Sequence, residues 1–500
     1  MKAILAAALL GVSTFAMPAH AEWMEATSDH FIVYGDMKPG DAKDFAEELE
    51  RMDKLLRSIT NTPNTAAERS NKVTVYFVPD MSTVERLIGR QGVGGFYVPN
   101  AQGSLAVTPK QLTRLAQYMQ PQEVLFHEYT HAILISGSKA SYPKWINEGL
   151  AEFFGTTQPK PDGSLVLGGL PMIRGFALAE QNQMSSEELL TADQRRLDDT
   201  DTEHLYARGW ATIHMLMLNK DRAGQLDKYM QLIQSGVPSL QAGRTAFGDL
   251  GKLDSDVKVH LRSRKFPSIL IPAAKVAGGQ ATVRPLRPCE AQIMPIRIRS
   301  AVGVNEKTSG PVAIQARQAA VGCDNDPFVQ RTLAETEYDA KNNAQSSAAA
   351  DRALAADPKN VMAMLYKGRV AARAKDWAGA RKWFIQANKL NPEFAMPLVL
   401  YHDSFTQAGA APTVAANNGL LRALVLVPQD DSVRIRAVMA MLAAGDKATA
   451  KAALEPLASA PHSKADSPAV TILKMINDGK DKAAIDAEIK KAKWNEIAAF

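Results

Sequence analysis

The chain has 500 residues, 46% of them hydrophobic and 22% charged, and this composition predicts two or three domains with packed cores and excludes a globally disordered protein. Its formal net charge of +5 is small and spread along the sequence, which argues against a nucleic-acid-binding protein. The densest basic cluster, Arg262, Arg264 and Lys265, is better explained as the solvated end of a helix than as a patch that binds nucleic acid.

The N-terminus has the three parts of a secretory signal peptide. Lys2 precedes an apolar run at residues 4–10, and residues 19–21 read Ala-His-Ala, which matches an A-x-A cleavage site. A membrane anchor is the alternative, but the apolar run is too short to cross a bilayer and Pro18 interrupts it. We therefore expect cleavage after Ala21, a periplasmic or secreted mature chain, and no transmembrane segment elsewhere.

Strand and helix patterns alternate at the start of the mature chain. β-Branched and aromatic residues favour strands, whereas apolar residues that recur every three or four positions favour helices. We predict a strand at 29–36, a helix at 41–59, a strand at 72–78, a short helix at 81–90, and one or two strands at 94–108. His30 is better explained as a structural or exposed residue than as a metal ligand.

The next helix, predicted at 121–136, carries the motif H-E-x-x-H as His127, Glu128 and His131. Residues four apart lie on one face of a helix, so both histidines can bind one metal ion. Glu128 follows the first of them, where a carboxylate can accept a proton from a metal-activated water. Alone, the motif is a weak signal, because this spacing also arises by chance in unrelated helices.

A second helix, predicted at 143–155, supplies a candidate third ligand. Glu148 lies seventeen residues after His131. A catalytic zinc needs three protein ligands and one open position, and two histidines with one glutamate are a common set. Glu152 lies one helical turn after Glu148 on the same face, and we expect it to hydrogen-bond the far nitrogen of a ligating histidine.

Three motifs together resemble those of the gluzincin zinc metallopeptidases, which include thermolysin and the single-zinc aminopeptidases. They are H-E-x-x-H at 127–131, W-x-N-E-G-x-A at 145–151 and Y-x-[KR]-G at 206–209, within a resemblance that covers about residues 25–265. The resemblance implies an α+β fold, namely a thermolysin-like zincin domain with a small N-terminal sheet and active-site helices.

The same resemblance assigns roles to individual residues. It implies one Zn2+ per chain, bound by His127, His131 and Glu148. It also implies that Glu128 is the general base and that the hydroxyl of Tyr206 stabilises the oxyanion. His204 is a candidate second oxyanion donor, although a surface or core role explains it better.

One departure concerns the aminopeptidases, in which the glutamate of an upstream G-x-M-E-N segment holds the free amine of the substrate. The corresponding stretch here, 93–100, has no acidic residue, which favours an endopeptidase-like or specialised peptidase. In the family an edge strand also pairs with the substrate backbone. Residues 96–100 or 103–107 therefore either line the active-site cleft or form an ordinary core hairpin.

Helices complete this first domain, which we place at 22–265. The predicted elements are a loop or hairpin at 158–169 and helices at 203–219, 224–235 and 253–265. A proline-rich connector follows at 266–330, in which Met294, Ile296 and Ile298 alternate as in a short strand. We expect a disulfide between Cys289 and Cys323, since two cysteines of an exported protein usually pair. The alternatives are two free buried thiols or one reactive thiol.

Residues 331–500 have a repeat of 34 residues, the distance between Pro358 and Pro392. Two small residues, Gly368 and Ala380, and one large residue, Trp377, occur at the spacing of a tetratricopeptide repeat. We count three or four such units, and a generic alanine-rich helical array is the alternative. Either arrangement is an α-solenoid, which usually presents a concave surface to a peptide or protein partner.

These observations lead to one expectation and two alternatives. We expect a periplasmic or secreted zinc peptidase that acts on a peptide or protein substrate, with helical repeats that bind the substrate or a protein partner. The first alternative is a catalytically silent zinc-binding scaffold that acts through its repeats. The second is a zinc hydrolase of a non-peptide amide.

Overall fold

The fold was analysed in a computed structural model that describes residues 22–110, 120–137, 142–180, 184–263, 266–459 and 467–492. The expected signal peptide, residues 1–21, lies outside these ranges, as do Arg264 and Lys265. Within the described part of the chain, no helix combines the length and the apolar character that crossing a bilayer requires.

A six-stranded sheet forms the centre of the first domain, with the strand order β4-β5-β3-β2-β1-β9. The strands are β1 (Trp23–Thr27), β2 (Phe31–Asp36), β3 (Val73–Val78), β4 (Phe96–Val98), β5 (Leu105–Pro109) and β9 (Thr282–Pro285). Strands β2, β3 and β5 are parallel, whereas β4 runs antiparallel to β5 and forms one edge of the sheet. The strands predicted at 29–36 and 72–78 are confirmed as β2 and β3, and the pattern at 94–108 is a hairpin of β4 and β5.

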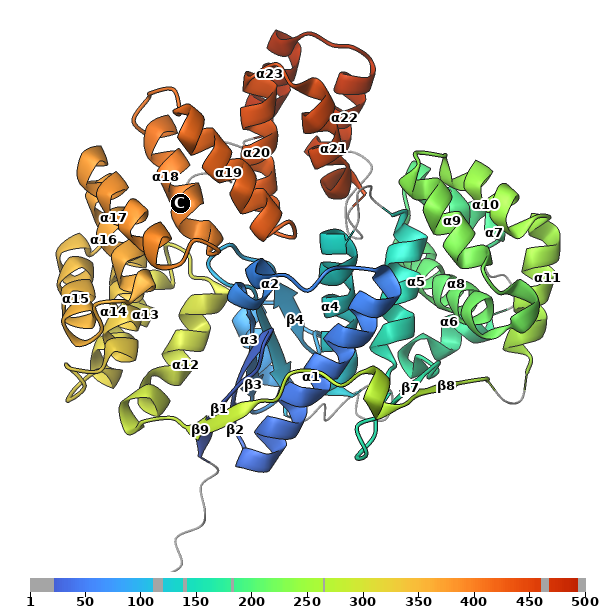
Figure 1. The fold of residues 1–500 in the computed structure, drawn as a ribbon, viewed down its shortest axis with the longest axis horizontal. Helices are drawn as coiled ribbons and strands as arrows, with labels where there is room; N and C mark the ends of the chain where they lie inside the picture. Colours follow the sequence, from blue (N-terminus) through green and yellow to red (C-terminus); the bar gives the residue numbers. More distant parts are fainter. Residues whose placement is uncertain are drawn as a thin grey trace, which may run out of the picture.

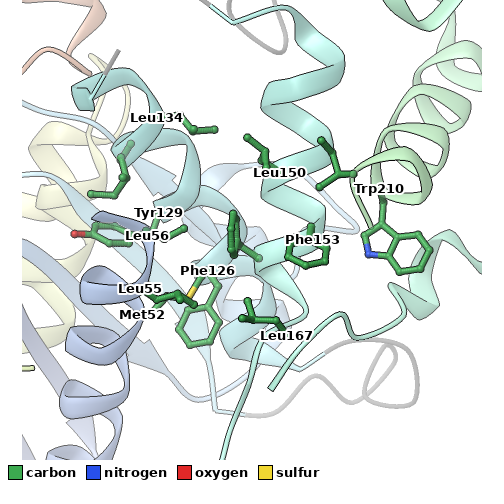
Figure 2. Close-up of a cluster of buried hydrophobic side chains, with 14 of the residues drawn as sticks. Met52, Leu55, Leu56, Phe126, Tyr129, Leu134, Leu150, Phe153, Leu167 and Trp210 are labelled. Carbon is green, nitrogen blue, oxygen red and sulfur yellow. The ribbon is translucent and has the colours of Figure 1, made fainter. Parts of the chain in front are cut away.

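Helices enclose the first hydrophobic core, which lies on one face of this sheet. The helices that contribute are α1 (Pro39–Thr60), α4 (Pro121–Gly137), α5 (Lys144–Gly155) and α8 (Asp199–Leu218). Figure 2 shows this core, in which Phe126 and Phe153 lie between the helices and are fully buried. Because the apolar side chains of α4 face this core, His127 and His131 are left on its other side, where both are only half-buried.

The remaining elements of the first domain flank the central sheet or lie beside α5 and α8 (Figure 1). Around them are α2 (Ala66–Ser70), α3 (Met81–Ile88), α6 (Gly175–Ala179), α7 (Ser186–Leu190), α9 (Gln225–Gln234), α10 (Ser239–Phe247), α11 (Leu250–Leu261) and the small sheet of β6 (Gln158–Pro159), β7 (Leu165–Leu167) and β8 (Ile269–Ile271). The helices predicted for this domain are confirmed, with ends that differ by a few residues. The predicted loop or hairpin at 158–169 is the hairpin of β6 and β7.

The second half of the described chain is an array of antiparallel helix pairs that curves around one end of the sheet (Figure 1). The helices are α12 (Pro288–Val302), α13 (Ser309–Ala319), α14 (Pro327–Asp339), α15 (Asn343–Ala356), α16 (Val361–Arg373), α17 (Trp377–Leu390), α18 (Ala395–Thr406), α19 (Val414–Leu426), α20 (Asp431–Ala443), α21 (Lys447–Ala458), α22 (Pro468–Asn477) and α23 (Lys482–Lys491). Helices α14, α16 and α18 begin at residues 327, 361 and 395, which are 34 residues apart. The predicted helical repeats are thus confirmed.

Close helix packing explains the small residues of the repeat. A Cβ atom added to Gly368 on α16 would lie only 2.3 Å from the ring of Phe384 on α17. Ala380 and Ala387, on the same face of α17 as Phe384, are fully buried. The pair α16 and α17 can therefore approach only with a residue no larger than glycine at position 368.

The inner surface of the helical array covers the second face of the sheet. Along β2 and β3, alternate side chains point to opposite faces, so Tyr34 and Tyr76 leave the first core and join another one. There they pack with Ile298 of α12, Leu333 of α14 and Tyr366 of α16. Part of the concave surface that we expected to face a partner is therefore occupied by the sheet of the same chain.

The segment at 266–330 belongs to both halves of the structure. Its strands β8 and β9 pair with β7 and β1, and its helices α12 and α13 begin the helical array. The predicted strand around Met294 to Ile298 is wrong, because these residues lie within α12. Met294 and Ile298 are both buried since they are one helical turn apart, and Pro295 is accommodated inside the helix. The expected disulfide is confirmed, with an S–S distance of 2.00 Å between Cys289 and Cys323.

The turn between β4 and β5 is inserted into the helical array. Asp430 precedes α20, and its Oδ1 accepts a hydrogen bond of 3.0 Å from the backbone N–H of Val433, which caps the helix. Its Oδ2 accepts a bond of 2.6 Å from the backbone N–H of Ala101, a residue that is 1% exposed and packs in the core of the repeats. A single buried carboxylate thus joins the array to the hairpin at the sheet edge.

We predict that Asp430→Asn releases this turn without unfolding α20. Asparagine caps a helix as well as aspartate does, but its amide nitrogen would meet the N–H of Ala101 as a second donor. Loss of a bond worth about 1.5 kcal/mol should raise amide hydrogen exchange at residues 99–104 about tenfold. The measurement is hydrogen exchange followed by mass spectrometry.

The matched control is Asp446→Asn, because Asp446 caps α21 in the same way and accepts from the N–H of Thr449 at 3.0 Å. This variant should leave exchange at the β4–β5 turn unchanged. Equal exchange rates at the turn in both variants would contradict a specific role of Asp430.

Candidate metal centre

The structure brings His127, His131 and Glu148 together between α4 and α5. The two Nε2 atoms lie 3.2 Å apart. Oε2 of Glu148 lies 3.5 Å from Nε2 of His127 and 3.6 Å from Nε2 of His131. The predicted triad of ligands therefore forms a compact triangle of donor atoms, with two corners from one helix and one from the next.

This triangle has the size that a tetrahedral zinc ion requires. Bonds of about 2.0–2.1 Å at tetrahedral angles place neighbouring ligand atoms roughly 3.3–3.4 Å apart, close to the three distances observed. The circle through the three donor atoms has a radius of roughly 2.0 Å, so a point at bonding distance from all of them exists. No movement of α4 relative to α5 is needed to hold an ion there.

Glu148 supports the same interpretation by its surroundings. The residue is 1% exposed, and neither of its carboxylate oxygens accepts a hydrogen bond from a described residue. Burial alone would raise the pKa of Glu148, but the charges of His131 and His127 hold it well below its usual range. A buried carboxylate without hydrogen bonds is costly unless a cation lies beside it, which fits a metal ligand.

The pKa of His127, which lies beside this carboxylate, is also changed by neighbouring groups. Burial by itself lowers the pKa of His127, but the carboxylates of Glu148 and Glu152 raise it to about 9. The site therefore attracts positive charge, either as protons on the histidines or as a metal ion that replaces them.

Two glycines set the distance between α5 and α8. A Cβ atom added to Gly149 would lie 2.8 Å from the carbonyl carbon of Gly209, and one added to Gly209 would lie 3.1 Å from the backbone oxygen of Trp145. These are the glycines of the second and third sequence motifs. Their contact lets the two helix backbones touch, so that Tyr206, three residues before Gly209, reaches the metal ligands on α4 and α5.

Tyr206 lies where the sequence analysis predicted it. Its ring is nearly parallel to that of His127, at 27° with 6.3 Å between ring centroids. Burial, and then the charge of Glu148, raise the pKa of Tyr206 far above its usual value, so its hydroxyl keeps its proton. His204 is directed elsewhere, since its Nε2 lies 2.7 Å from a carboxylate oxygen of Glu180.

Glu128 is half-buried, and its charge influences two neighbouring residues. Its negative charge contributes to the raised pKa of His127 and to that of Tyr97 on the edge strand β4. The charge of Glu128 therefore acts on the candidate ligand His127 and on the edge strand.

Glu152 is close to the ligands but does not form the predicted hydrogen bond. Its Oε1 lies 3.7 Å from Nδ1 of His127 because Arg174 binds the same oxygen through Nε at 3.1 Å and Nη2 at 2.8 Å. Arg174 ends a short 3₁₀ turn, Met172–Arg174, and also donates two bonds of 2.8 and 2.7 Å to Glu203. Its guanidinium carbon lies 4.5 Å from the centre of the Tyr206 ring.

Sequence reasoning missed Arg174 because nothing in its spacing connects it with the three motifs. It lies 22 residues after Glu152, in a turn rather than on one of the motif helices. Only the folded chain shows that one guanidinium holds a carboxylate beside His127 and covers the ring of Tyr206.

A second buried cluster of possible metal ligands, His30, Glu50 and Asp53, contacts α4 through hydrogen bonds. Nδ1 of His30 lies 2.8 Å from a Glu50 oxygen. Oδ1 of Asp53 accepts bonds of 2.7 Å from Arg57 and 2.6 Å from the hydroxyl of Tyr129, two residues after His127. The bond from Tyr129 to Asp53 ties α4 to α1, and the buried His30 is bound to the same helix α1 through Glu50.

Comparisons with known proteins leave the family of this chain open. No family model matches the sequence, and no curated protein matches it either. Among solved structures, a tetratricopeptide repeat protein from Parabacteroides merdae is 10% identical, with a TM-score of 0.29 over 55% of this chain and 96% of that chain. Yeast Tom70 is 15% identical, with a TM-score of 0.27 over 64% of this chain and 72% of that chain. Since both TM-scores are below 0.5, we base no structural or functional argument on them.

We predict that Arg174→Met destabilises the domain by about 3 kcal/mol, because it leaves the buried Glu152 carboxylate without its main cation. The side chains of this ion pair are 16% and 7% exposed. Urea denaturation measures the change in the free energy of unfolding.

As a control, Arg244→Met breaks an ion pair with Glu187 in which both side chains are 59% exposed. It should cost at most about 1 kcal/mol, since exposed pairs contribute little. Similar losses in the two variants would show that Arg174 has no special electrostatic role.

Proposed function

We propose that this chain is a zinc-dependent peptidase that hydrolyses peptide bonds in a peptide or protein substrate. The observation that carries the proposal is the donor triangle of His127, His131 and Glu148, in which the buried carboxylate accepts no hydrogen bond within the described part of the chain. The motif resemblance to the gluzincin metallopeptidases points to the same chemistry. A disulfide in the chain agrees with export to an oxidising compartment, as the N-terminal sequence predicts.

The residues around the triangle supply the groups that peptide hydrolysis needs. A zinc ion bound by the three ligands would act as a Lewis acid and lower the pKa of a water molecule towards about 7. Glu128 would accept a proton from that water and return it to the leaving amine. The hydroxyl of Tyr206 would donate a hydrogen bond to the oxygen that gains negative charge, a contact worth ~3–4 kcal/mol in comparable sites.

The position of the edge strand supports an extended peptide as the substrate. Strand β4 is the last strand of the six-stranded sheet, so its outer edge pairs with no other described strand. An added peptide strand would find backbone donors and acceptors there, next to the helix α4 that carries Glu128. The stretch at 93–100 has no carboxylate to hold a free amine, and we therefore favour an endopeptidase over an aminopeptidase.

The helical repeats are the part of the chain that we assign to a partner or to the flanking part of a substrate. A second candidate function, a zinc-binding scaffold without turnover, is favoured by their extent, since α12 to α23 make up the second half of the described chain. Helical arrays of this kind commonly act by binding proteins. A zinc hydrolase of a non-peptide amide would use the same ligands on another substrate.

We predict that the purified chain binds about one zinc per molecule and that Glu148→Ala weakens zinc binding by more than about 100-fold, because one of three ligands is lost. Zinc should raise the unfolding temperature of the wild type and leave that of the variant unchanged. Metal analysis by mass spectrometry and thermal unfolding with and without a chelator provide the two measurements. Wild-type protein without zinc affinity would remove the basis of the proposal.

We predict that Glu128→Gln keeps the zinc but abolishes cleavage of a mixed peptide library, because the amide cannot accept the proton. Glu123→Gln is the matched control, one turn before His127 on the same helix, and it should keep both zinc and activity. Cleavage by Glu128→Gln at the wild-type rate would refute the general-base role. Zinc binding without cleavage by the wild type would favour the scaffold or a non-peptide amide substrate.

A further inference from the structure

A cavity of about 790 Å³ lies between the helical array and the β4–β5 hairpin, away from the candidate metal centre. Its inner wall comes from α12, α14 and α16, and its opposite wall includes Val98, Asn100 and Gln102 of the hairpin. The volume is within the range that small-molecule and peptide sites have in other proteins. Neither the metal ligands nor Glu128 and Tyr206 line it.

Basic side chains outnumber acidic ones along this cavity. Arg297, Lys341, Arg369 and Arg373 line it, together with Glu306, Glu335 and Asp339. Arg297 binds Glu335 at 2.7 and 2.6 Å, and Lys341 binds Glu306 at 2.9 Å. Glu335 and Glu306 are thus paired with Arg297 and Lys341. The third acidic lining residue, Asp339, lies near Arg369 and Arg373.

Asp339 does not cancel the remaining positive charge at neutral pH. Burial, followed by the nearby charge of Glu335, raises the pKa of Asp339 to about 7, although Arg369 and Arg373 lower it in part. Its negative charge is therefore weakened near neutral pH. The inner wall of the cavity keeps an excess of positive charge.

Contacts with neighbouring residues of the described chain hold the guanidinium of Arg373 in place and use only one of its nitrogen atoms, Nη1, as a donor. Its guanidinium carbon lies 3.5 Å from the centre of the Tyr338 ring, and Nη1 donates to the backbone oxygen of Tyr338 at 2.7 Å and to Oδ1 of Asn343 at 2.9 Å. Among the described residues, Nε and Nη2 of Arg373 donate no hydrogen bond. A planar guanidinium with two adjacent donors available is suited to a carboxylate.

Aromatic and apolar groups complete the lining. The rings of Tyr338 and Tyr366 lie 5.8 Å apart at an angle of 58°, and Arg369 lies over the Tyr366 ring at 5.3 Å. Leu105 and Met396 add apolar surface. A ligand with both carboxylates and hydrophobic groups would match these walls, whereas a small inorganic anion would leave the apolar part unused.

We propose that this cavity binds an acidic peptide segment, with a carboxylate at Arg373 and the rest of the segment between the tyrosines of the array and the β4–β5 hairpin. A bound segment would contact the repeats and the edge of the sheet at once. The proposal does not depend on the zinc chemistry, because it rests on a separate cavity.

The test is a binding measurement on the full chain that carries Glu128→Gln, so that a bound peptide is not cleaved. The probes are two fluorescein-labelled pools of acetylated and amidated decapeptides, with glutamate or glutamine fixed at alternate positions and random residues between. Fluorescence polarisation should show tighter binding of the glutamate pool, weakened by salt. Arg373→Gln should lower the affinity for that pool about tenfold, since a charge-assisted bond is lost.

Arg381→Gln is the matched control, because Arg381 lies 3.7 Å from the centre of the Phe405 ring and donates to the backbone oxygen of Ser404 at 2.9 Å, but does not line the cavity. It should leave the affinity unchanged. Ala301→Phe, which fills the cavity and keeps every arginine, should abolish binding. Equal binding of the two pools, equal effects of the two arginine variants, or full binding by Ala301→Phe would overturn the proposal.

Discussion

The two carboxylate oxygens of Glu148 lie in the protein interior and accept no hydrogen bond from the residues that the structure describes, and much of the first domain is arranged around this costly group. Two histidines one helical turn apart face it, and their charges lower its pKa. The contact between Gly149 and Gly209 brings α8 close enough for Tyr206 to join them. The geometry of the site is thus held by close helix packing.

The sheet connects this site to the helical repeats. Alternate side chains of β2 and β3 enter two different cores, one shared with α1 and α4 and the other shared with α12, α14 and α16. The sheet is therefore a middle layer, and Figure 1 shows the array curving around it. The buried Asp430 adds a direct link to the turn that follows the edge strand, so the repeats support the hairpin beside the candidate metal centre.

Much of the candidate site could be predicted because its parts are local. The H-E-x-x-H spacing places two histidines on one helix face whatever the rest of the chain does. Glu148 could be added because it lies in the next predicted helix, seventeen residues after His131. Glu152 was placed correctly near His127, but its hydrogen-bond partner was not, since Arg174 arrives from a turn that no motif connects to it. The strand predicted at 294–298 was wrong for another reason. Met294 and Ile298 share one face both in a strand and in a helix, so their spacing does not distinguish the two.

The sequence by itself determined the secondary structure of the first domain, the spacing of the three metal-ligand candidates, the cysteine pair and the period of the repeats. Most of these follow from interactions between residues close in the chain, and the cysteine pair follows because the chain has only two cysteines. Only the tertiary structure decided that the sheet fills part of the concave surface, that Asp430 holds the β4–β5 turn, and that an arginine-lined cavity remains between them. These features depend on contacts between residues hundreds of positions apart, such as Ala101 and Asp430, and no local pattern encodes which distant surfaces will meet.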